Sequence, residues 1–94
     1  YFEYGQNRRV KLVATTGTWY LSSSMKSLEK QMESYGFLVP HKSFLVNPRQ
    51  ILSFGAEIQM KNHEMIPIAK NRRKQVHEQI SAYLHNSLNI NWRD

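Results

Sequence analysis

Apolar residues fall at every second position near the start of the chain, which is the pattern of a strand half-buried on a core. The alternation runs through residues 9–14, and residues 18–21 are rich in the β-branched and aromatic types that suit a pleated surface. Thr16 and Gly17 lie between these segments and can supply a turn. The pattern therefore predicts a β-hairpin.

Helical spacing follows the hairpin and predicts one short internal helix. Its apolar face consists of Met25, Leu28, Met32 and Tyr35. Ser23 or Ser24 can accept a hydrogen bond from a free amide at the start, and Gly36 can end the helix in a left-handed conformation. We expect this helix to pack its apolar face on the sheet and to carry no chemistry.

Strand patterns return after Gly36. The short apolar or alternating segments are residues 37–39, 44–46, 51–54, 57–61 and 65–68. Asn62 and His63 suit a turn before the last segment, and Pro67, which cannot donate to a ladder, predicts an edge strand there.

From about Asn71 the spacing becomes helical again. The apolar positions of this segment are Val76, Ile80, Tyr83, Leu84 and Leu88, and Asn71 could cap the helix. We therefore predict a mainly β fold of small packed sheets, with one short internal helix and an appended C-terminal helix at about 71–88. The chain is expected to be a single domain over residues 1–94, with its core at about 1–74.

Thirteen Lys and Arg residues against seven Asp and Glu residues give a formal net charge of +6. This charge favours an anionic partner such as nucleic acid, an acidic membrane surface or an acidic protein. The absence of cysteine excludes thiol nucleophiles and disulfides and fits a reducing, cytoplasmic location. No apolar run is long enough to span a bilayer, so we expect no membrane contact. Because the chain begins at Tyr1, we expect it to be a piece of a longer protein.

Candidate catalytic groups are scattered, so no enzymatic activity, metal site or cofactor is expected. Asp94 is the only aspartate, and the glutamates form no recognisable acid–base pair. His77 begins a motif like that of a zinc-protease helix, but Ser81 occupies the position of the second histidine ligand. His41 and Ser43 could suggest a base and a nucleophile, but no third orienting group accompanies them, and a structural histidine is favoured.

The cationic residues are gathered into three clusters at the ends of predicted elements. The first contains Arg8, Arg9 and Lys11, the second surrounds Lys42, and the third spans residues 70–74. Loops that carry Arg, Lys and Asn can bind phosphates and base edges of duplex DNA. A single cluster of this kind is more often solvated surface, but three on a chain of this charge favour nucleic acid.

One segment indicates a protein family far more specifically than the composition does. Residues 36–51 read Gly-Phe-Leu-Val-Pro-His-Lys-Ser-Phe-Leu-Val-Asn-Pro-Arg-Gln-Ile. This stretch resembles the signature of LytTR DNA-binding domains. In that signature a Phe precedes the run His-(Arg/Lys)-Ser-aromatic-aliphatic-Val-Asn, and an Ile follows a few residues later. Segments 2–4, 9–12, 24–29 and 66–73 resemble the flanking elements of that family. The resemblance covers about residues 1–74, and Ala69 stands where the family commonly has Ser.

The resemblance implies small packed β-sheets whose loops, rather than a recognition helix, enter successive major grooves of duplex DNA. Carried over position by position, it implies DNA contacts at Arg9, Lys42 and Asn71. The cationic residues beside these positions, also predicted to bind DNA, are Arg8, Lys70, Arg72 and Arg73. We expect His41 and Asn47 to be structural instead, with side chains that bind nearby loop backbone.

Domains of this family usually follow a receiver domain or a membrane sensor in bacterial transcription regulators. The resemblance therefore implies an output domain that binds double-stranded promoter DNA, with a receiver or sensor domain upstream in the parent chain. A second copy on an adjacent site is a further candidate partner. Two alternatives stay open: a protein-interaction or sensory module whose basic loops meet an acidic partner, and an RNA-binding domain.

Overall fold

The computed structural model describes residues 1–5 and 9–92, and for residues 87–92 it describes the backbone alone. In chain order the elements are β1 (Phe2–Tyr4), β2 (Val10–Ala14), β3 (Gly17–Leu21), α1 (Met25–Glu33), β4 (Leu38–His41), β5 (Phe44–Val46), the 3-10 helix η2 (Pro48–Gln50), β6 (Ile51–Phe54), β7 (Glu57–Met60), β8 (Met65–Pro67), the 3-10 helix η3 (Lys70–Arg72) and α2 (Arg73–Trp92). The mainly β class, with one internal and one C-terminal helix, is confirmed.

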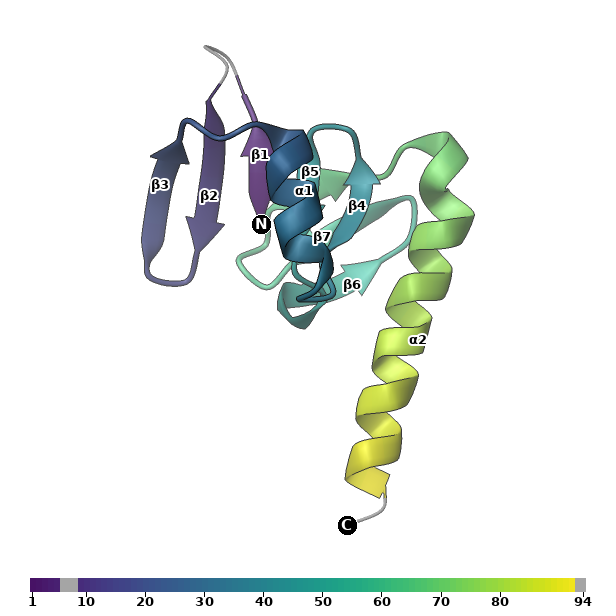
Figure 1. Ribbon diagram of the computed structural model, residues 1–94. Coiled ribbons are helices and arrows are strands. Elements are labelled where there is room, and N and C mark those ends of the chain that lie inside the picture. Colours follow the sequence, from purple (N-terminus) through teal and green to yellow (C-terminus); the bar gives the residue numbers. More distant parts are fainter. Residues whose placement is uncertain (6–8, 93–94) are drawn as a thin grey trace.

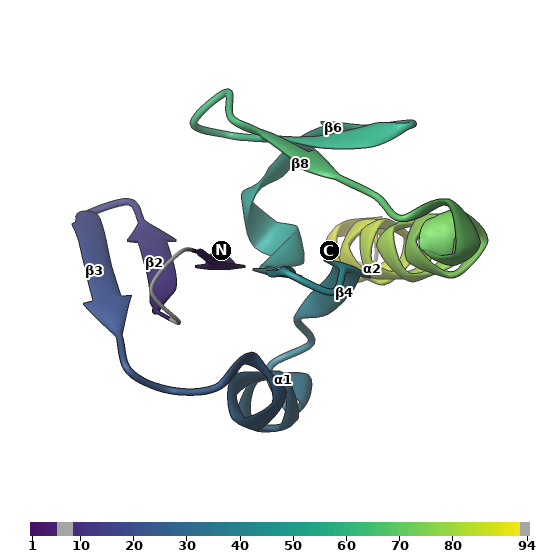
Figure 2. The same ribbon diagram turned by 90° about the horizontal axis from the view of Figure 1, so that it is seen from above.

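The strands form two antiparallel sheets. The first has five strands in the order β3-β2-β1-β5-β4, and the second has three in the order β6-β7-β8. Seen from above, the five-stranded sheet lies between the three-stranded sheet on one side and α1 on the other, with α2 alongside (Figure 2). Strand β8 lies at an edge, as Pro67 predicted.

Each face of the five-stranded sheet covers its own core. Phe2, Val10 and Leu45 pack with Leu28 of α1 on one face. On the other face, a larger cluster joins the two sheets to α2 and consists of Tyr1, Leu38, Val46, Ile58, Met60, Ile66, Ile68, Val76 and Ile80. Fully burying one such aliphatic side chain is worth about 1.5–3 kcal/mol, so these two cores fix the strands from which the loops project.

The predicted hairpin and the start of the internal helix are confirmed. Strands β2 and β3 pair from Val10–Leu21 to Ala14–Gly17. Ser24 is the N-cap of α1, and its Oγ accepts a hydrogen bond from the Ser27 amide at 3.1 Å.

The end of the internal helix differs from the expectation at one residue. Helix α1 ends at Glu33, so Tyr35 lies beyond it and is 73% exposed; its assignment to the apolar face was wrong. The sequence spacing continues past the point where Gly36, at φ +78°, turns the backbone away. Gly36 therefore has the left-handed conformation predicted for it.

A hydrogen bond between two residues far apart in the sequence joins the two sheets near the start of the chain. The Tyr1 hydroxyl donates a hydrogen bond to the Glu64 carboxylate in the turn between β7 and β8. Burial, together with this bond, raises the pKa of the Tyr1 phenol above its ordinary value. The His63 amide donates a hydrogen bond to the Met60 carbonyl at 2.8 Å and closes the turn, near the predicted Asn62–His63 position.

Helix α2 begins later and ends later than the range expected from the sequence. Its first part is docked on the body, where Val76 and Ile80 are buried, but Leu84 is 46% exposed. The imidazole Nε2 of His77 lies 2.7 Å from the Gly55 carbonyl oxygen, and its ring meets that of Phe54 edge-on. Beyond this docked part, α2 extends away from the sheets (Figure 1).

Candidate nucleic-acid interface

Three connections that carry the cationic clusters lie at the same end of the molecule, at the top of Figure 1. They are the end of β1 with the start of β2, the turn between β4 and β5, and η3 with the start of α2. We call this the basic end and define it by Arg9, Lys42, Lys70, Asn71, Arg72 and Arg73. Five of these six side chains are exposed, and Arg72 is half-buried.

Backbone hydrogen bonds hold the three connections against one another. The Tyr4 amide donates to the Ser43 carbonyl at 2.8 Å, which fixes the end of β1 against the β4–β5 turn. The Ala69 amide donates to the Pro40 carbonyl at 2.8 Å, which fixes the start of η3 against the end of β4. The three clusters, separated by tens of residues in the chain, are thus parts of one surface.

The β4–β5 turn presents Lys42 at its tip. Within the turn, Nδ1 of His41 accepts a hydrogen bond from the Ser43 amide at 3.1 Å, and the His41 ring meets Phe44 edge-on. His41 therefore shapes the turn backbone, which is the geometry expected of a structural residue. Lys42 itself is exposed and free to reach a ligand beyond the turn.

Asn47 lies away from this surface, at the start of η2. Its Oδ1 accepts a hydrogen bond from the Arg49 amide at 3.1 Å, so it caps the 3-10 helix that Pro48 begins. The bond is solvent-exposed rather than buried. We therefore expect Asn47 to contribute the free energy of a helix cap rather than that of a buried hydrogen bond.

The cap expected of Asn71 is not formed. The N-cap position of η3 is Ala69, which has an extended backbone (φ −61°, ψ 137°) and no side chain able to accept a hydrogen bond. Asn71 lies inside η3, two residues further on, and is exposed. An N-cap needs an extended backbone just before the helix, so a residue within the helical turn cannot serve.

Replacing Ala69 with Ser is expected to stabilise the fold by about 1 kcal/mol, because Oγ can accept a hydrogen bond from a free amide of the first turn. For a domain of this size that corresponds to a rise in Tm of about 4–8 °C, measured by circular dichroism. Ala82→Ser, an exposed change within α2, is the matched control and should slightly lower Tm. Equal effects of the two changes would contradict the cap argument.

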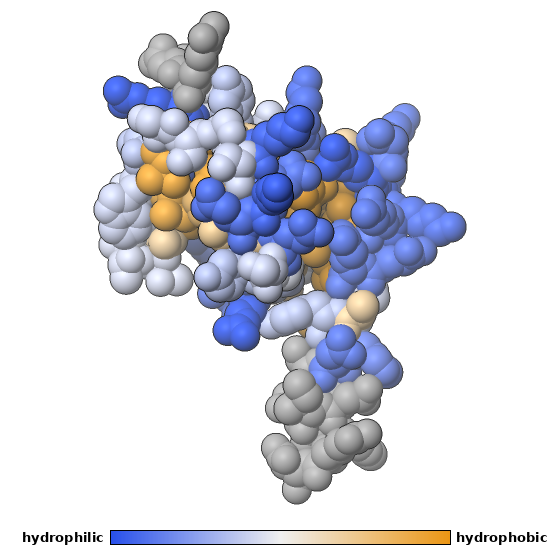
Figure 3. All heavy atoms as spheres, viewed as in Figure 1, coloured by the Kyte–Doolittle hydropathy of each residue, from blue (hydrophilic) through white to orange (hydrophobic). Residues whose placement is uncertain are grey.

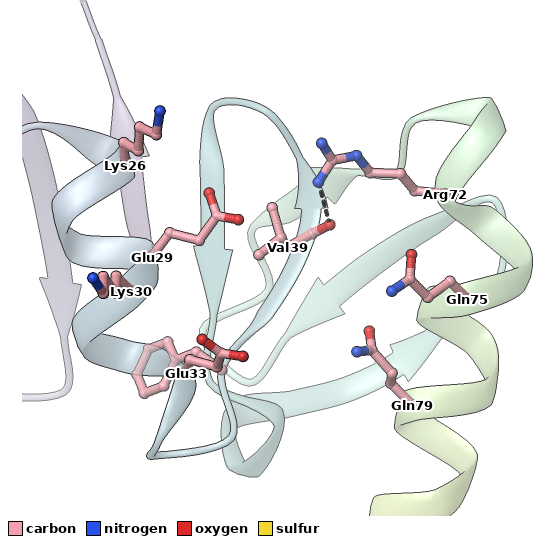
Figure 4. Close-up of a pocket in the computed structure, with 9 residues that line it drawn as sticks. Lys26, Glu29, Lys30, Glu33, Val39, Arg72, Gln75 and Gln79 are labelled. Atoms are coloured by element: carbon pink, nitrogen blue, oxygen red, sulfur yellow. Dashed lines mark hydrogen bonds between the residues drawn. The ribbon is translucent and has the colours of Figure 1, made fainter.

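Arg72 is held inward, toward a groove beside the basic end. Its Nη1 donates to the Val39 carbonyl at 3.1 Å, a contact between residues 33 positions apart. In Figure 4 the guanidinium lies across the upper end of the groove rather than away from it. Arg72 therefore connects η3 to β4, a role with no signal in the sequence.

The groove lies between α1 and α2, over β4, and has a volume of about 640 Å³. Glu29 and Glu33 of α1 and Gln75 and Gln79 of α2 point toward each other across it (Figure 4). The surface over both helices on this side is strongly hydrophilic (Figure 3). Acidic and basic side chains both line the groove, so its charge does not favour DNA as the basic end does.

One predicted DNA-binding residue cannot be placed on this surface. Arg8 was predicted to bind DNA beside Arg9, but it lies outside the described residues. Among the described residues no three His, Asp or Glu side chains gather as metal ligands would. No helix in the same part of the chain is long and apolar enough to cross a membrane.

A small, mainly β structure with cationic loops gathered at one end has the surface chemistry typical of nucleic-acid-binding modules. The family model of the LytTR DNA-binding domain matches residues 1–81 of the chain. The chain therefore belongs to the LytTR family of DNA-binding domains. A search of curated proteins finds no match.

The family match extends further along the chain than the resemblance of residues 1–74. It ends at residue 81, directly after Ile80, which is the last buried residue of α2 in the described part of the chain. The docked first part of α2 thus lies within the family's domain.

Proposed function

We propose that the basic end binds double-stranded DNA sequence-specifically, with the Arg9 and Lys42 loops and η3 entering successive major grooves. The observation that carries this proposal is the pair of backbone bonds, Tyr4 to Ser43 and Ala69 to Pro40, that hold three cationic connections on one surface. Arg and Lys side chains there can bond guanine O6 and N7, and Asn71 can bond adenine or a phosphate. The proposed function is binding alone, without a catalytic step.

We further propose that this module is the output domain of a bacterial transcription regulator that acts in the cytoplasm on promoter DNA. A receiver or sensor domain upstream in the parent chain would control it, and a second copy would occupy an adjacent site on the same duplex. Support for these statements comes from the family, whose members bind DNA. The target sequence is a property to be measured.

The proposal is tested by selecting duplexes from a random library on the purified chain and titrating a labelled selected duplex by fluorescence anisotropy. We expect a selected site to be bound tightly, and to be displaced by unlabelled copies far better than by bulk DNA or RNA. Equal displacement by RNA would favour the RNA-binding alternative. Absence of any selected duplex would overturn specific DNA binding.

A pair of triple variants locates the interface. Changing Arg9, Lys42 and Arg73 to Ala removes three charges from the basic end, and should abolish measurable binding. Changing three exposed lysines elsewhere, Lys26, Lys30 and Lys61, removes the same charge and should leave most of the affinity. Similar losses in both variants would show that only net charge matters.

Asn47→Ala is expected to lower stability by about 1 kcal/mol while leaving DNA affinity unchanged at temperatures where the protein is folded. Asn47→Asp keeps the acceptor oxygen for the Arg49 amide and should retain nearly the full Tm. Thermal denaturation and anisotropy on the same samples separate the two effects. An unchanged Tm with lost DNA binding would make Asn47 a contact residue.

The neighbours Arg72 and Arg73 are expected to behave differently although both are cationic. Arg72→Ala loses the bond to the Val39 carbonyl and should lower stability by about 1 kcal/mol. Arg73→Ala, at an exposed position, should change stability by less than about 0.5 kcal/mol and lower the salt dependence of binding by about one unit of slope. Thermal denaturation and salt titrations measure both quantities. An equal Tm for the two variants would show that the Arg72 bond contributes nothing.

A further inference from the structure

Strand β3 lies at one edge of the five-stranded sheet, and no described strand pairs with its outer side. Figures 1 and 2 show the β2–β3 hairpin standing out from the body with β3 outermost. An unpaired strand edge presents a row of backbone N–H and C=O groups. The edge of β3 can therefore accept a further strand.

The other sheet edges are protected in ways that β3 is not. At the β4 edge, Pro40 lacks a donor and its carbonyl is taken by Ala69, and the Val39 carbonyl is taken by Arg72. The β8 edge contains Pro67, and β6 faces α2 across a cleft of about 280 Å³. Strand β3 contains no proline and no charged residue, and its register with β2 is unbroken. Prolines, occupied backbone groups and a covering helix are devices by which natural edges avoid pairing, and β3 has none of them.

Large side chains are exposed along this edge. Trp19 is 47% exposed and Tyr20 is 63% exposed. Trp19 pairs across the hairpin with Leu12, which belongs to the core under α1, so both lie on the α1 side of the sheet. Figure 3 shows apolar surface uncovered between the hairpin and α1.

We propose that β3 pairs antiparallel with β3 of a second copy of this chain, around a two-fold axis at Trp19. Identical strands in antiparallel pairing present the same groups to each other, so the edge complements itself. Full overlap of Gly17–Leu21 places the two Trp19 residues directly opposite each other. It also places Leu21 of one copy opposite Gly17 of the other, where the ring of Trp19 lies over the glycine and offers Leu21 an apolar contact.

Strand β3 carries no charge that would repel a second copy. The chain carries a net charge of +6, which opposes self-association in general, but none of that charge lies on β3. A cross-strand aromatic pair at the centre adds a specific contact. A five-residue edge buries less than about 1,000 Å² in total, so the dimer is weak and its fraction rises with concentration.

The two-fold axis places the basic ends of the two copies at opposite ends of the dimer. Leu21 pairs with Val10, which directly follows Arg9, so the basic end lies at the Leu21 end of β3. Antiparallel pairing sets that end of one copy beside the Gly17 end of the other. The dimer therefore holds two separate duplex segments and bridges them. The bridging rests on the proposed function, whereas the pairing of the strands does not.

Sedimentation equilibrium over a concentration series tests the pairing without DNA. The unaltered chain should dimerise, and Trp19→Lys and Trp19→Glu should each be monomeric because like charges would lie directly opposite. Mixing the two variants should restore the dimer. Met65→Lys and Met65→Glu, at a position 52% exposed on the β8 edge, are controls that should leave dimerisation unchanged. A monomer at every concentration, or a dimer unaffected by the Trp19 changes, overturns the proposal.

A cysteine cross-link provides a second test that does not depend on charge. Because the chain has no cysteine, Trp19→Cys carries a single thiol. Directly opposed residues of antiparallel strands have Cα atoms about 4.5–5.5 Å apart, which suits a disulfide. Under mild oxidation Trp19→Cys should give a covalent dimer at least tenfold faster than Met65→Cys. Equal rates contradict the pairing.

Bridging is measured by immobilising one selected duplex, loading the protein and adding a second, labelled duplex. The unaltered chain should retain the second duplex, and folded Trp19→Lys should bind one duplex with unchanged affinity but retain none of the second. Loss of all single-duplex binding would refute the proposed function while leaving the sedimentation result intact. Single-duplex binding without any dimer would refute the pairing alone.

Discussion

Raising the salt concentration from about 50 to about 200 mM is expected to weaken DNA binding by the chain about a thousandfold. The cationic residues at the basic end and directly after it are Arg9, Lys42, Lys70, Arg72, Arg73 and Lys74. If the protein surface around them neutralises about six phosphates in total, log K falls against log salt with a slope of about −5, because the condensed counterions are released. The loss over this range corresponds to about 4 kcal/mol.

Anisotropy titrations at four or more salt concentrations measure that slope. Circular dichroism at each concentration is the control, since the fold must remain intact while affinity falls. The triple variant lacking charge at Arg9, Lys42 and Arg73 should show a slope smaller by at least the one unit expected of the phosphate-binding Arg73, wherever its binding is still measurable. A flat response with an intact fold would contradict phosphate binding by these loops and favour a partner that is not a polyanion.

Much of the fold follows from local pattern, because alternation and helical spacing are set by neighbouring residues. The hairpin of β2 and β3, the Ser24 cap and the edge position of Pro67 are all consequences of short-range chemistry. The pattern fails where a second feature overrides it. Tyr35 keeps the helical spacing, but Gly36 has already turned the chain, so the residue is exposed.

The joining of the basic clusters could not be predicted from the residues themselves. The bonds from Tyr4 to Ser43 and from Arg72 to Val39 connect positions far apart in the chain, and backbone donors exist at nearly every residue. Arg72 therefore had the same sequence signal as Arg73, although one is half-buried and the other exposed. Only the three-dimensional packing separates a cation that also holds the fold from one that is fully exposed.

The second large effect separates residues that read bases from residues that bind phosphates. Arg9→Ala and Lys42→Ala are each expected to cost about 1–3 kcal/mol on the selected duplex, a loss of about five- to 150-fold, and much less on a scrambled duplex. The reason is that bidentate bonds to guanine depend on sequence. Asn71, exposed and free of any capping role, should follow the same pattern if it bonds adenine.

Arg73→Ala is the matched control for these variants, because it borders the start of α2, where free amides and the positive end of the helix dipole already favour phosphate. Its loss should be equal on the selected and scrambled duplexes. Each variant is titrated on both duplexes, with folding checked by circular dichroism. Equal losses on both duplexes for Arg9 and Lys42 would show that their loops bind only the DNA backbone. Specificity would then arise from the sequence-dependent shape and deformability of the DNA, and the selected sites would share flexible steps rather than common base edges at the loops.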